Sequence, residues 1–239
     1  MPGPTIWTLL SWGPDGWSDD IAYGALVTIA LALATLPFGL VIGFFVAFAK
    51  QQEEPSLRLA ANIYTTVFRG LPELVTLFLF FFGMPLLLQH VIRWFNPDAT
   101  IDVNSFIAGM IVLSLIFSSY ASEVFLSAFR AIPKGQYEGG YAIGLSKWQT
   151  MRKVILPQLV RIAFPGLENC WLILLKDTSL VSVVNLAETL RNAGVAARVT
   201  KHSFLFYSLA ALVFLVLAIL SSIATGFIVR SLARKGATR

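Results

Sequence analysis

"IAYGALVTIALALATLPFGLVIGFFVAFA", residues 21–49, contains no Asp, Glu, Lys or Arg. A helix needs about 20 predominantly apolar residues to cross the hydrocarbon core of a bilayer. Irregular backbone exposed to lipid is excluded from that core, because its polar groups would have no hydrogen-bond partners. The stretch therefore predicts a transmembrane helix and places the chain among membrane proteins.

The composition of the whole chain supports this class. Of its 239 residues, 56% are hydrophobic and 13% are charged, whereas soluble domains are about 25% charged. We predict an all-α polytopic membrane protein in which residues 1–20 precede one transmembrane domain, 21–239. The lone Cys170 excludes an internal disulfide. The predicted spans are Ile21–Ala49, about Leu59–Leu88 with Arg69 and Glu73 inside it, Ser105–Phe129, Ile162–Val184 and Phe204–Val229.

The positive residues predict the orientation of these spans, because cytoplasmic segments of membrane proteins carry an excess of Lys and Arg. With the N-terminus outside, residues 1–20 form a periplasmic segment, and they lack the positive n-region of a signal peptide. The basic residues lie in short segments beside apolar runs, which suits membrane orientation rather than nucleic-acid binding. The inside set is then Lys50, Arg58, Arg69, Arg130, Lys134, Lys147, Arg152, Lys153, Arg161, Arg230, Arg234, Lys235 and Arg239, against Arg93, Arg191, Arg198 and Lys201 outside.

The large cytoplasmic loop, about residues 130–161, has its own helix signals. Pro133 fits the first position of a helix, where its missing N–H does no harm. Gly144 fits the left-handed position that ends a helix. The loop is predicted to begin with one short helix that ends in a turn at this glycine.

A second short helix is predicted to follow the turn. Ser146 and Gln149 have the spacing of a capping box. The helix is expected to run to Leu156 and to stop before Pro157, because a proline disfavours helical geometry in the preceding residue.

Apolar residues of the loop recur at helical spacing on these two helices. One interpretation is that they attach the loop to the protein's own transmembrane helices. The other is that part of this face inserts into a groove on a cytoplasmic partner. The residues concerned are Tyr137, Tyr141, Trp148, Met151 and Ile155.

The same loop resembles a known signature. Residues 138–140 (EGG), Gly144 and residues 154–157 (VILP) are similar to the "EAA…G…I-LP" pattern of ATP-binding-cassette importer permeases, with glycines in place of the two alanines and valine in place of the isoleucine. The segments "FRGLPELV", "YASEVFLSAFRAIPKGQ" and "LLKDTSLVSVV" resemble the polar amino acid permeases of that superfamily, of the histidine, arginine, ornithine and opine type. The likeness covers nearly the whole chain after about residue 20.

This resemblance implies a transport subunit in a bacterial inner membrane, surrounded by lipid, that forms the pathway with a second, related permease as a heterodimer. A periplasmic binding protein would deliver a polar amino acid, in particular a basic one (arginine, histidine, ornithine or lysine), or an opine, near residues 90–104 and 185–203. A dimer of ATPase subunits would bind the loop. The residues implied in this coupling are Tyr137, Glu138, Gly139, Gly140, Tyr141, Gly144, Leu156 and Pro157.

Other features agree with a chain that is not itself an enzyme. No G-x-x-x-x-G-K-[ST] loop is present, so ATP is expected on the partner subunit, and no cofactor, metal site or catalytic residues are expected. Ionisable residues inside spans are costly and mark pathways or ion pairs. Glu123 and Glu168 could attract a cationic substrate, or form structural pairs with, for example, Arg130 or Arg161. The candidate pathway residues are Glu123, Glu168, Lys176 and Asp177.

Arg69, Gly70 and Pro72 form a candidate hinge, because Pro72 cannot donate a hydrogen bond to the carbonyl of Phe68 and should kink the second span. Two rival functions follow from the residues alone. An ATP-independent secondary transporter or channel subunit should show inverted repeats, and none is visible. A membrane-embedded enzyme needs a convergent set of titrating residues, which the sequence does not offer.

Overall fold

The computed structural model of the chain describes residues 5–94 and 103–237, with side chains as far as Ile228. Every regular element in these two ranges is a helix. In chain order they are α1 (Ile6–Leu9), α2 (Ser18–Lys50), α3 (Pro55–Gly70), α4 (Glu73–Phe78), η1 (Leu79–Gly83), α5 (Met84–Arg93), α6 (Ser105–Ala131), α7 (Lys134–Ala142), α8 (Lys147–Thr150), η2 (Met151–Ile155), α9 (Leu156–Asp177), η3 (Thr178–Val184), α10 (Thr189–Thr200) and α11 (Ser203–Ala237).

Four helical runs in the described residues are long and apolar enough to cross a membrane. They are α2, Glu73–Arg93, α6 and the Ser203–Ile228 part of α11. A fifth crossing results if Lys147–Val184 and Thr189–Thr200, which meet at 49°, form one bent span. The prediction of an all-α membrane protein with about five spans is confirmed on this basis.

The predicted beginning of the second span is wrong. The chain does not form one helix from Leu59. Instead, α3 ends at Gly70 and a new helix begins at Glu73. Pro72 between them has φ −57° and ψ 134°, an extended conformation. Because a proline also disfavours helical geometry in the residue before it, Leu71 leaves the helix as well, and the result is a break rather than a kink.

The predicted end of the second loop helix is also wrong. From Lys147 to Asp177, α8, η2 and α9 follow one another without a break. In the π-helical segment η2, the N–H of Leu156 donates to the carbonyl of Met151, five residues earlier. This wider turn leaves room for the ring of Pro157, which would clash with a carbonyl in a regular α-helix. The π-helical segment η1 likewise comes just before a proline, Pro85.

The helices form two compact units, and α2, α6, α9 and α11 each contribute to both. Unit 1 comprises Met1–Leu36, Leu71–Leu113 and Leu174–Ile219, and unit 2 comprises Pro37–Gly70, Ser114–Ile173 and Leu220–Arg239.

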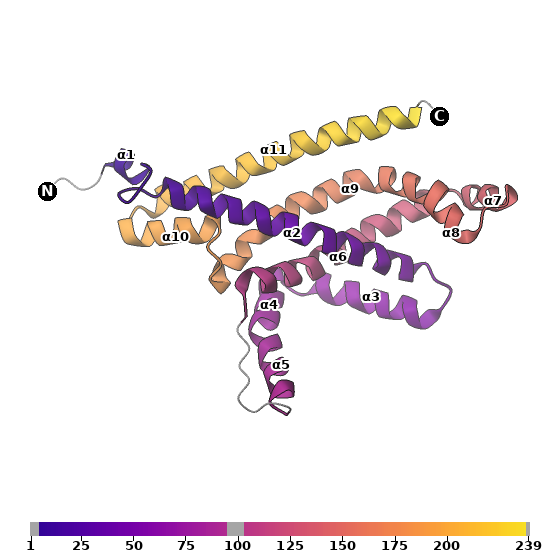
Figure 1. Ribbon diagram of the computed structural model, residues 1–239, viewed down its shortest axis with the longest axis horizontal. Coiled ribbons are helices and arrows are strands. Elements are labelled where there is room, and N and C mark those ends of the chain that lie inside the picture. The colour runs from indigo at the N-terminus through magenta and orange to yellow at the C-terminus, as the bar shows by residue number, and fades with distance from the viewer. Residues whose placement is uncertain (1–4, 95–102, 238–239) are drawn as a thin grey trace. The chain divides into compact units, whose positions relative to one another are not determined.

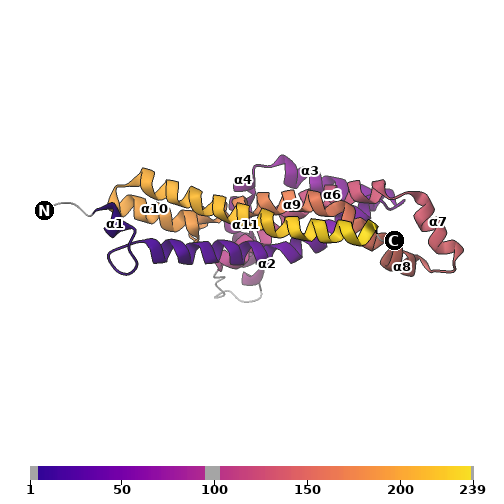
Figure 2. The same ribbon diagram turned by 90° about the horizontal axis from the view of Figure 1, so that it is seen from above.

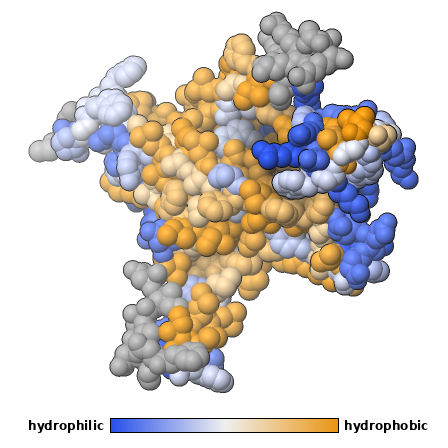
Figure 3. Space-filling model, turned by 45° about the vertical axis from the view of Figure 1, so that its right-hand side comes forward, coloured by the Kyte–Doolittle hydropathy of each residue, from blue (hydrophilic) through white to orange (hydrophobic). Residues whose placement is uncertain are grey.

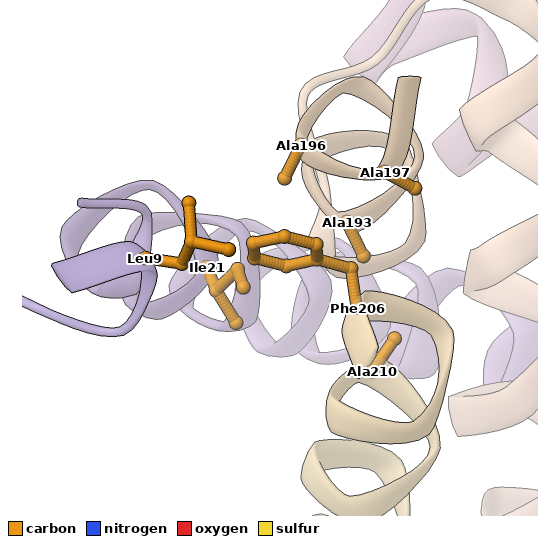
Figure 4. Packing of buried hydrophobic residues seen from close by; sticks show 7 residues of the cluster. All are labelled: Leu9, Ile21, Ala193, Ala196, Ala197, Phe206 and Ala210. Carbon is orange, nitrogen blue, oxygen red and sulfur yellow. The ribbon is translucent and has the colours of Figure 1, made fainter. Parts of the chain in front are cut away.

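A cluster of buried apolar side chains holds one end of unit 1 together, where α1, the start of α2, α10 and the start of α11 meet (Figure 1). The ring of Phe206 lies between Leu9 and Ile21 on one side and the small side chain of Ala193 on the other (Figure 4). The edge of Trp17 packs on the same ring, with centroids 6.3 Å apart. The cluster therefore fixes α1 to α2, α10 and α11.

In unit 2 the last part of α2 packs closely on α6. A Cβ atom on Gly43 would lie 3.0 Å from the Cβ of Ala121. The rings of Phe44 and Phe125 pack edge to face, with centroids 5.7 Å apart. Small residues let membrane helices approach each other closely, and this contact brings the end of α2 beside the charged residue of α6 described below.

Many large hydrophobic side chains lie on the surface, and they cover much of the face seen in Figure 3. Soluble monomers rarely expose large contiguous apolar patches. Such a surface is suited to lipid or to another membrane helix. Exposed examples on α2, α5 and α11 are Leu26, Phe45, Leu86, Leu87, Leu215, Leu220 and Phe227.

Candidate functional site

The loop between α6 and α9 carries the first candidate site, with α7 and α8 beyond the ends of α6 and α9 that belong to unit 2 (Figures 1 and 2). Pro133 precedes the first helical residue of α7 and is extended (φ −60°, ψ 143°), one position earlier than predicted. Gly144 has φ +82°, so the prediction of a left-handed glycine at the turn is confirmed. A residue with a Cβ is strained in this conformation.

The predicted capping box is confirmed at the start of α8. The N–H of Gln149 donates to Oγ of Ser146 at 3.3 Å, and the N–H of Ser146 donates to Oε1 of Gln149 at 2.9 Å. Two N–H groups that would otherwise lack partners at the helix start are satisfied in this way. The side chain of Gln158, on α9, donates to Oε1 of Gln136 at 3.0 Å, which connects α7 to α9 as well.

Two adjacent glycines of α7 lie in different surroundings. A Cβ on Gly139 would meet no atom within 4 Å, whereas a Cβ on Gly140 would lie 2.6 Å from Cγ2 and 2.8 Å from Oγ1 of Thr150. Thr150 is fully buried. Gly140 is therefore required for α7 to pack on the start of the long helix, and Gly139 is not.

The side chains of α7 divide between solvent and the rest of unit 2. Glu138 is exposed. Tyr137 is half-buried, and burial raises the pKa of its phenol above the ordinary value. Tyr137 and Tyr141 line a groove with residues of α2, α8 and η2, and Leu156 contributes to it too. Pro157 is exposed.

A cluster of charges lies where α2, α3 and α6 meet in unit 2. The Nζ of Lys50, whose side chain is only 6% exposed, is 2.5 Å from Oε1 of Glu123 and 2.7 Å from Oγ1 of Thr65. Arg69 lies 3.6 Å from the same carboxylate, and its guanidinium carbon is 5.6 Å from the ring centroid of Tyr120. One carboxylate thus faces two cations, and the three helices are held together.

Glu123 therefore takes part in a structural ion pair, but with partners other than those expected. Its partners are Lys50 and Arg69 rather than Arg130 or Arg161. Lys50 ends α2 and Arg69 lies in the last turn of α3, so both partners come from helix ends that pack beside α6. Glu168 is bound differently, because its Oε1 accepts a hydrogen bond of 2.5 Å from Oγ1 of Thr225.

Lys176 and Asp177 lie at the end of α9 in unit 1, and neither forms an ion pair with a residue in the described ranges. Lys176 is exposed and Asp177 is half-buried. The segment η3, which begins directly after Asp177, packs against α4, whose first residue is Glu73. Asp177 therefore lies in the part of unit 1 where η3 meets the helix that begins at Glu73, and it is next in sequence to the positive charge of Lys176.

The proposed hinge lies at the break between α3 and α4. Gly70 is the last residue of α3, and a Cβ there would meet nothing within 4 Å. The carbonyl of Pro72 accepts from the N–H of Thr76 at 3.0 Å and from its hydroxyl at 3.2 Å. Arg69 is engaged with Glu123 and Tyr120, as described above. The helix is thus interrupted at a defined point, while hinge motion itself stays a prediction.

Sequence reasoning missed a buried carboxylate in unit 1. Glu188 is fully buried, and its side chain accepts from the N–H of Arg191 at 2.7 Å, which caps α10. Thr28 of α2 donates to Glu188 at 3.4 Å and lies 2.9 Å from the hydroxyl of Thr189. The available signal was an acidic residue directly before a helix. Among the described residues, no group of three His, Cys, Asp or Glu side chains could hold a metal ion.

Comparison with known proteins gives one family match, to the inner membrane components of binding-protein-dependent transport systems, over residues 39–234. The nopaline transport system permease protein NocQ of Agrobacterium fabrum is 43% identical over 216 residues, covering 90% of this chain and 92% of that protein. The histidine/lysine/arginine/ornithine permease protein HisQ of Salmonella typhimurium is 36% identical over 207 residues, covering 87% and 90%.

Solved structures agree with these relatives. A chain of an amino acid ABC transporter crystallised with histidines has a TM-score of 0.76 and 27% identity, covering 90% of this chain and 95% of that one. A chain of the inward-facing MetNI methionine ABC transporter has a TM-score of 0.68 at 18% identity, covering 97% and 99%. The second likeness bears on the fold alone.

Proposed function

This chain belongs to the family of binding-protein-dependent transport system inner membrane components, and on that basis we propose that it carries basic amino acids or opines. It is a multi-pass protein of the bacterial inner membrane and serves an ABC importer of amino acids or opines. The observation that carries this proposal is the 43% identity to a nopaline permease over 90% of the chain, together with 36% identity to a histidine/lysine/arginine/ornithine permease. Permeases for nopaline, for octopine and for histidine, lysine, arginine and ornithine are thus all among the relatives of this chain.

We place ATPase coupling in α7 and the turn at Gly144. The support is the exposed Glu138 at a position that resembles the acidic residue of the family signature, together with a connected path into the membrane. The close approach of Gly140 to Thr150 and the hydrogen bond between Gln158 and Gln136 tie α7 to the helix that continues as α9. A displacement of α7 by an ATPase would therefore move α9 within unit 2. ATP itself would be bound by the partner subunit.

For the substrate, we propose that Asp177, with Glu73 nearby, attracts the cationic group. Neither Lys176 nor Asp177 is held in an ion pair by the described residues, which leaves Asp177 available to a ligand. Glu123 and Glu168, by contrast, already have close partners in unit 2, so their role in the pathway is weaker in this proposal. Lys176 is placed to meet a carboxylate of the substrate or of a second permease chain.

The remaining assembly follows from the family. A second, related permease would complete the pathway, and a periplasmic binding protein would dock near residues 90–104 and 185–203. Within the first of these two segments, residues 95–102 lie outside the described residues. This arrangement needs the N-terminus outside, as the distribution of Lys and Arg predicts. Energy from ATP on a partner subunit is favoured over the secondary-transporter alternative by the family match.

The test is co-purification of the ATPase with the permease, followed by ATPase activity in lipid with the binding protein present. Wild type should retain the ATPase and show activity that the binding protein stimulates. Glu138→Ala and Gly144→Asp should lose both, and Lys134→Ala, an exposed cation at the start of the same helix, serves as the matched control. Equal retention of the ATPase by all four proteins would contradict coupling through α7.

The substrate class needs a separate measurement, of uptake into lipid vesicles that contain the assembled transporter. Uptake of labelled arginine is measured in competition with histidine, ornithine, lysine, nopaline and octopine. Asp177→Asn should reduce uptake of the cationic substrates while leaving basal ATPase activity intact. Unchanged arginine uptake by Asp177→Asn would remove this residue from the proposed pathway.

A further inference from the structure

An open groove of about 560 Å³ in unit 2 is lined by aromatic side chains together with two cationic ones. The aromatic residues come from two places, the last two turns of α2 and the two short helices of the loop. Phe45 is 63% exposed and Trp148 is 71% exposed. Residues of the groove include Phe44, Phe45, Phe48, Tyr137, Tyr141 and Trp148.

The groove lies where a membrane helix leaves the bilayer. Its α2 residues are within the last turns of a 33-residue helix, which is about 50 Å long, against a hydrocarbon core of about 30 Å. In the proposed orientation this end of α2 lies at the cytoplasmic face, at the level of the lipid head groups. Trp and Tyr favour that level because one end of the ring is apolar and the other is polar.

Two cations complete the groove. Lys147 and Arg152 line it, both are exposed, and neither forms an ion pair within the part of the chain that the structure describes. An apolar lining with unpaired positive side chains complements a molecule that has an apolar tail and an anionic head. At the cytoplasmic leaflet, anionic phospholipids are the abundant molecules of this kind.

We propose that this groove is a binding site for one anionic phospholipid of the inner leaflet. The acyl chain lies against Phe45 and Trp148, and the phosphate is held between Lys147 and Arg152. The lipid would fill the space between α2 and the loop and so stabilise the position of α7. The proposal rests on the proposed orientation of the chain, but not on its substrate or on ATPase binding.

The experiment uses Trp148 as its own probe. The full chain is reconstituted in vesicles that contain brominated phosphatidylglycerol or brominated phosphatidylcholine, because bromine on an acyl chain quenches nearby tryptophan fluorescence. The difference between wild type and Trp148→Phe isolates the quenching at this residue. We expect brominated phosphatidylglycerol to half-saturate this quenching at a mole fraction at least tenfold lower, since each cation near an anionic lipid contributes roughly fivefold.

Lys147→Gln with Arg152→Gln should abolish this preference. Lys134→Gln with Lys153→Gln removes two exposed cations of the same loop that do not line the groove, and should leave it unchanged. Equal quenching by both lipids, or equal loss in the two double variants, overturns the proposal. So does relief of the quenching when the ATPase binds, because the groove would then be a protein-docking surface. Failure of transport with intact lipid preference would count against the proposed function alone.

Discussion

Replacing Gly139 by alanine should strengthen α7, whereas the same change at Gly140 should weaken it. Alanine gains about 1 kcal/mol over glycine inside a helix, and at Gly139 nothing opposes the gain because the new Cβ meets no atom within 4 Å. At Gly140 the Cβ would lie 2.6 Å from Cγ2 of Thr150. Such overpacking costs about 1–3 kcal/mol, so the net effect is about 0–2 kcal/mol unfavourable.

Thr150 cannot easily move away, because it is fully buried and its β-branched side chain has few rotamers. Its hydroxyl has no hydrogen-bond partner in the described structure. Thr150→Ala therefore breaks no hydrogen bond. Combining Thr150→Ala with Gly140→Ala should recover most of the lost stability of α7, because Cγ2 and Oγ1 are removed and only the Cβ of residue 150, at 3.2 Å, is left close to the new Cβ. Wild type, Gly140→Ala, Thr150→Ala and the variant with both changes form a double-mutant cycle that isolates the interaction between the two side chains.

Hydrogen exchange of the amides in residues 134–142, read by mass spectrometry in lipid nanodiscs, measures the local opening of α7. Gly139→Ala should slow exchange by up to about fivefold, and Gly140→Ala should accelerate it by up to about thirtyfold, from the free energies above. If Gly140→Ala slows exchange as Gly139→Ala does, or if Thr150→Ala gives no rescue, the packing argument is refuted.

Four further substitutions test other parts of the structure. Glu123→Gln leaves the buried ammonium of Lys50 without its counter-charge and should lower the free energy of unfolding in detergent by about 3 kcal/mol. Arg69→Gln changes a half-exposed side chain and should lower the same free energy by no more than about 1 kcal/mol. Equal effects of the two variants would contradict the assigned pairing. Gly144→Ala should cost about 1 kcal/mol because of its positive φ, read as faster hydrogen exchange across the turn. Ser146→Ala should cost about 1 kcal/mol through loss of the capping box, with faster exchange at the start of α8 as the readout.

Spans that are uniformly apolar could be predicted from the sequence, because no other structure accommodates them. The first and third runs coincide with α2 and α6 within a few residues, and the fifth coincides with the Ser203–Ile228 part of α11. Helix ends could also be predicted where they depend on neighbouring residues alone. The positive φ of Gly144 and the capping box at Ser146 depend on residues at most three positions apart.

The effects of Pro72 and Pro157 on their helices were harder to predict, because a proline can end a helix or be accommodated inside it. At Pro72 the helix breaks completely, and Gly70 is the last helical residue before the break. At Pro157 the π-turn in η2 lets the helix continue, and nothing in the local sequence distinguishes the two outcomes. Tertiary packing of the long helix decides the second case.

The sequence identifies the charged residues inside the membrane domain as candidate site residues, but it does not identify the residues with which they interact. Glu123 pairs with Lys50, 73 positions away in sequence, and Glu188 bonds to Thr28, 160 positions away. Such pairs depend on which helices pack together, and a single sequence carries no direct record of that. The division of Gly139 and Gly140 into an open and a tightly packed position is likewise a property of tertiary contact.

The π-turn of η2 also sets the rotational phase between the loop and the membrane helix. Each residue of an α-helix advances about 100° around the axis, so the additional residue that a π-turn holds offsets α8 from α9 by about that angle. If η2 became regular α-helix with all its residues kept, the offset would be lost, and the loop would turn around the axis of α9 and point the face of α7 in a new direction. Deleting one residue from 151–155 would instead keep the phase, because one residue fewer fits a regular α-helical turn. The wide turn can thus decide whether the cytoplasmic loop meets its partner while the membrane span keeps its full length.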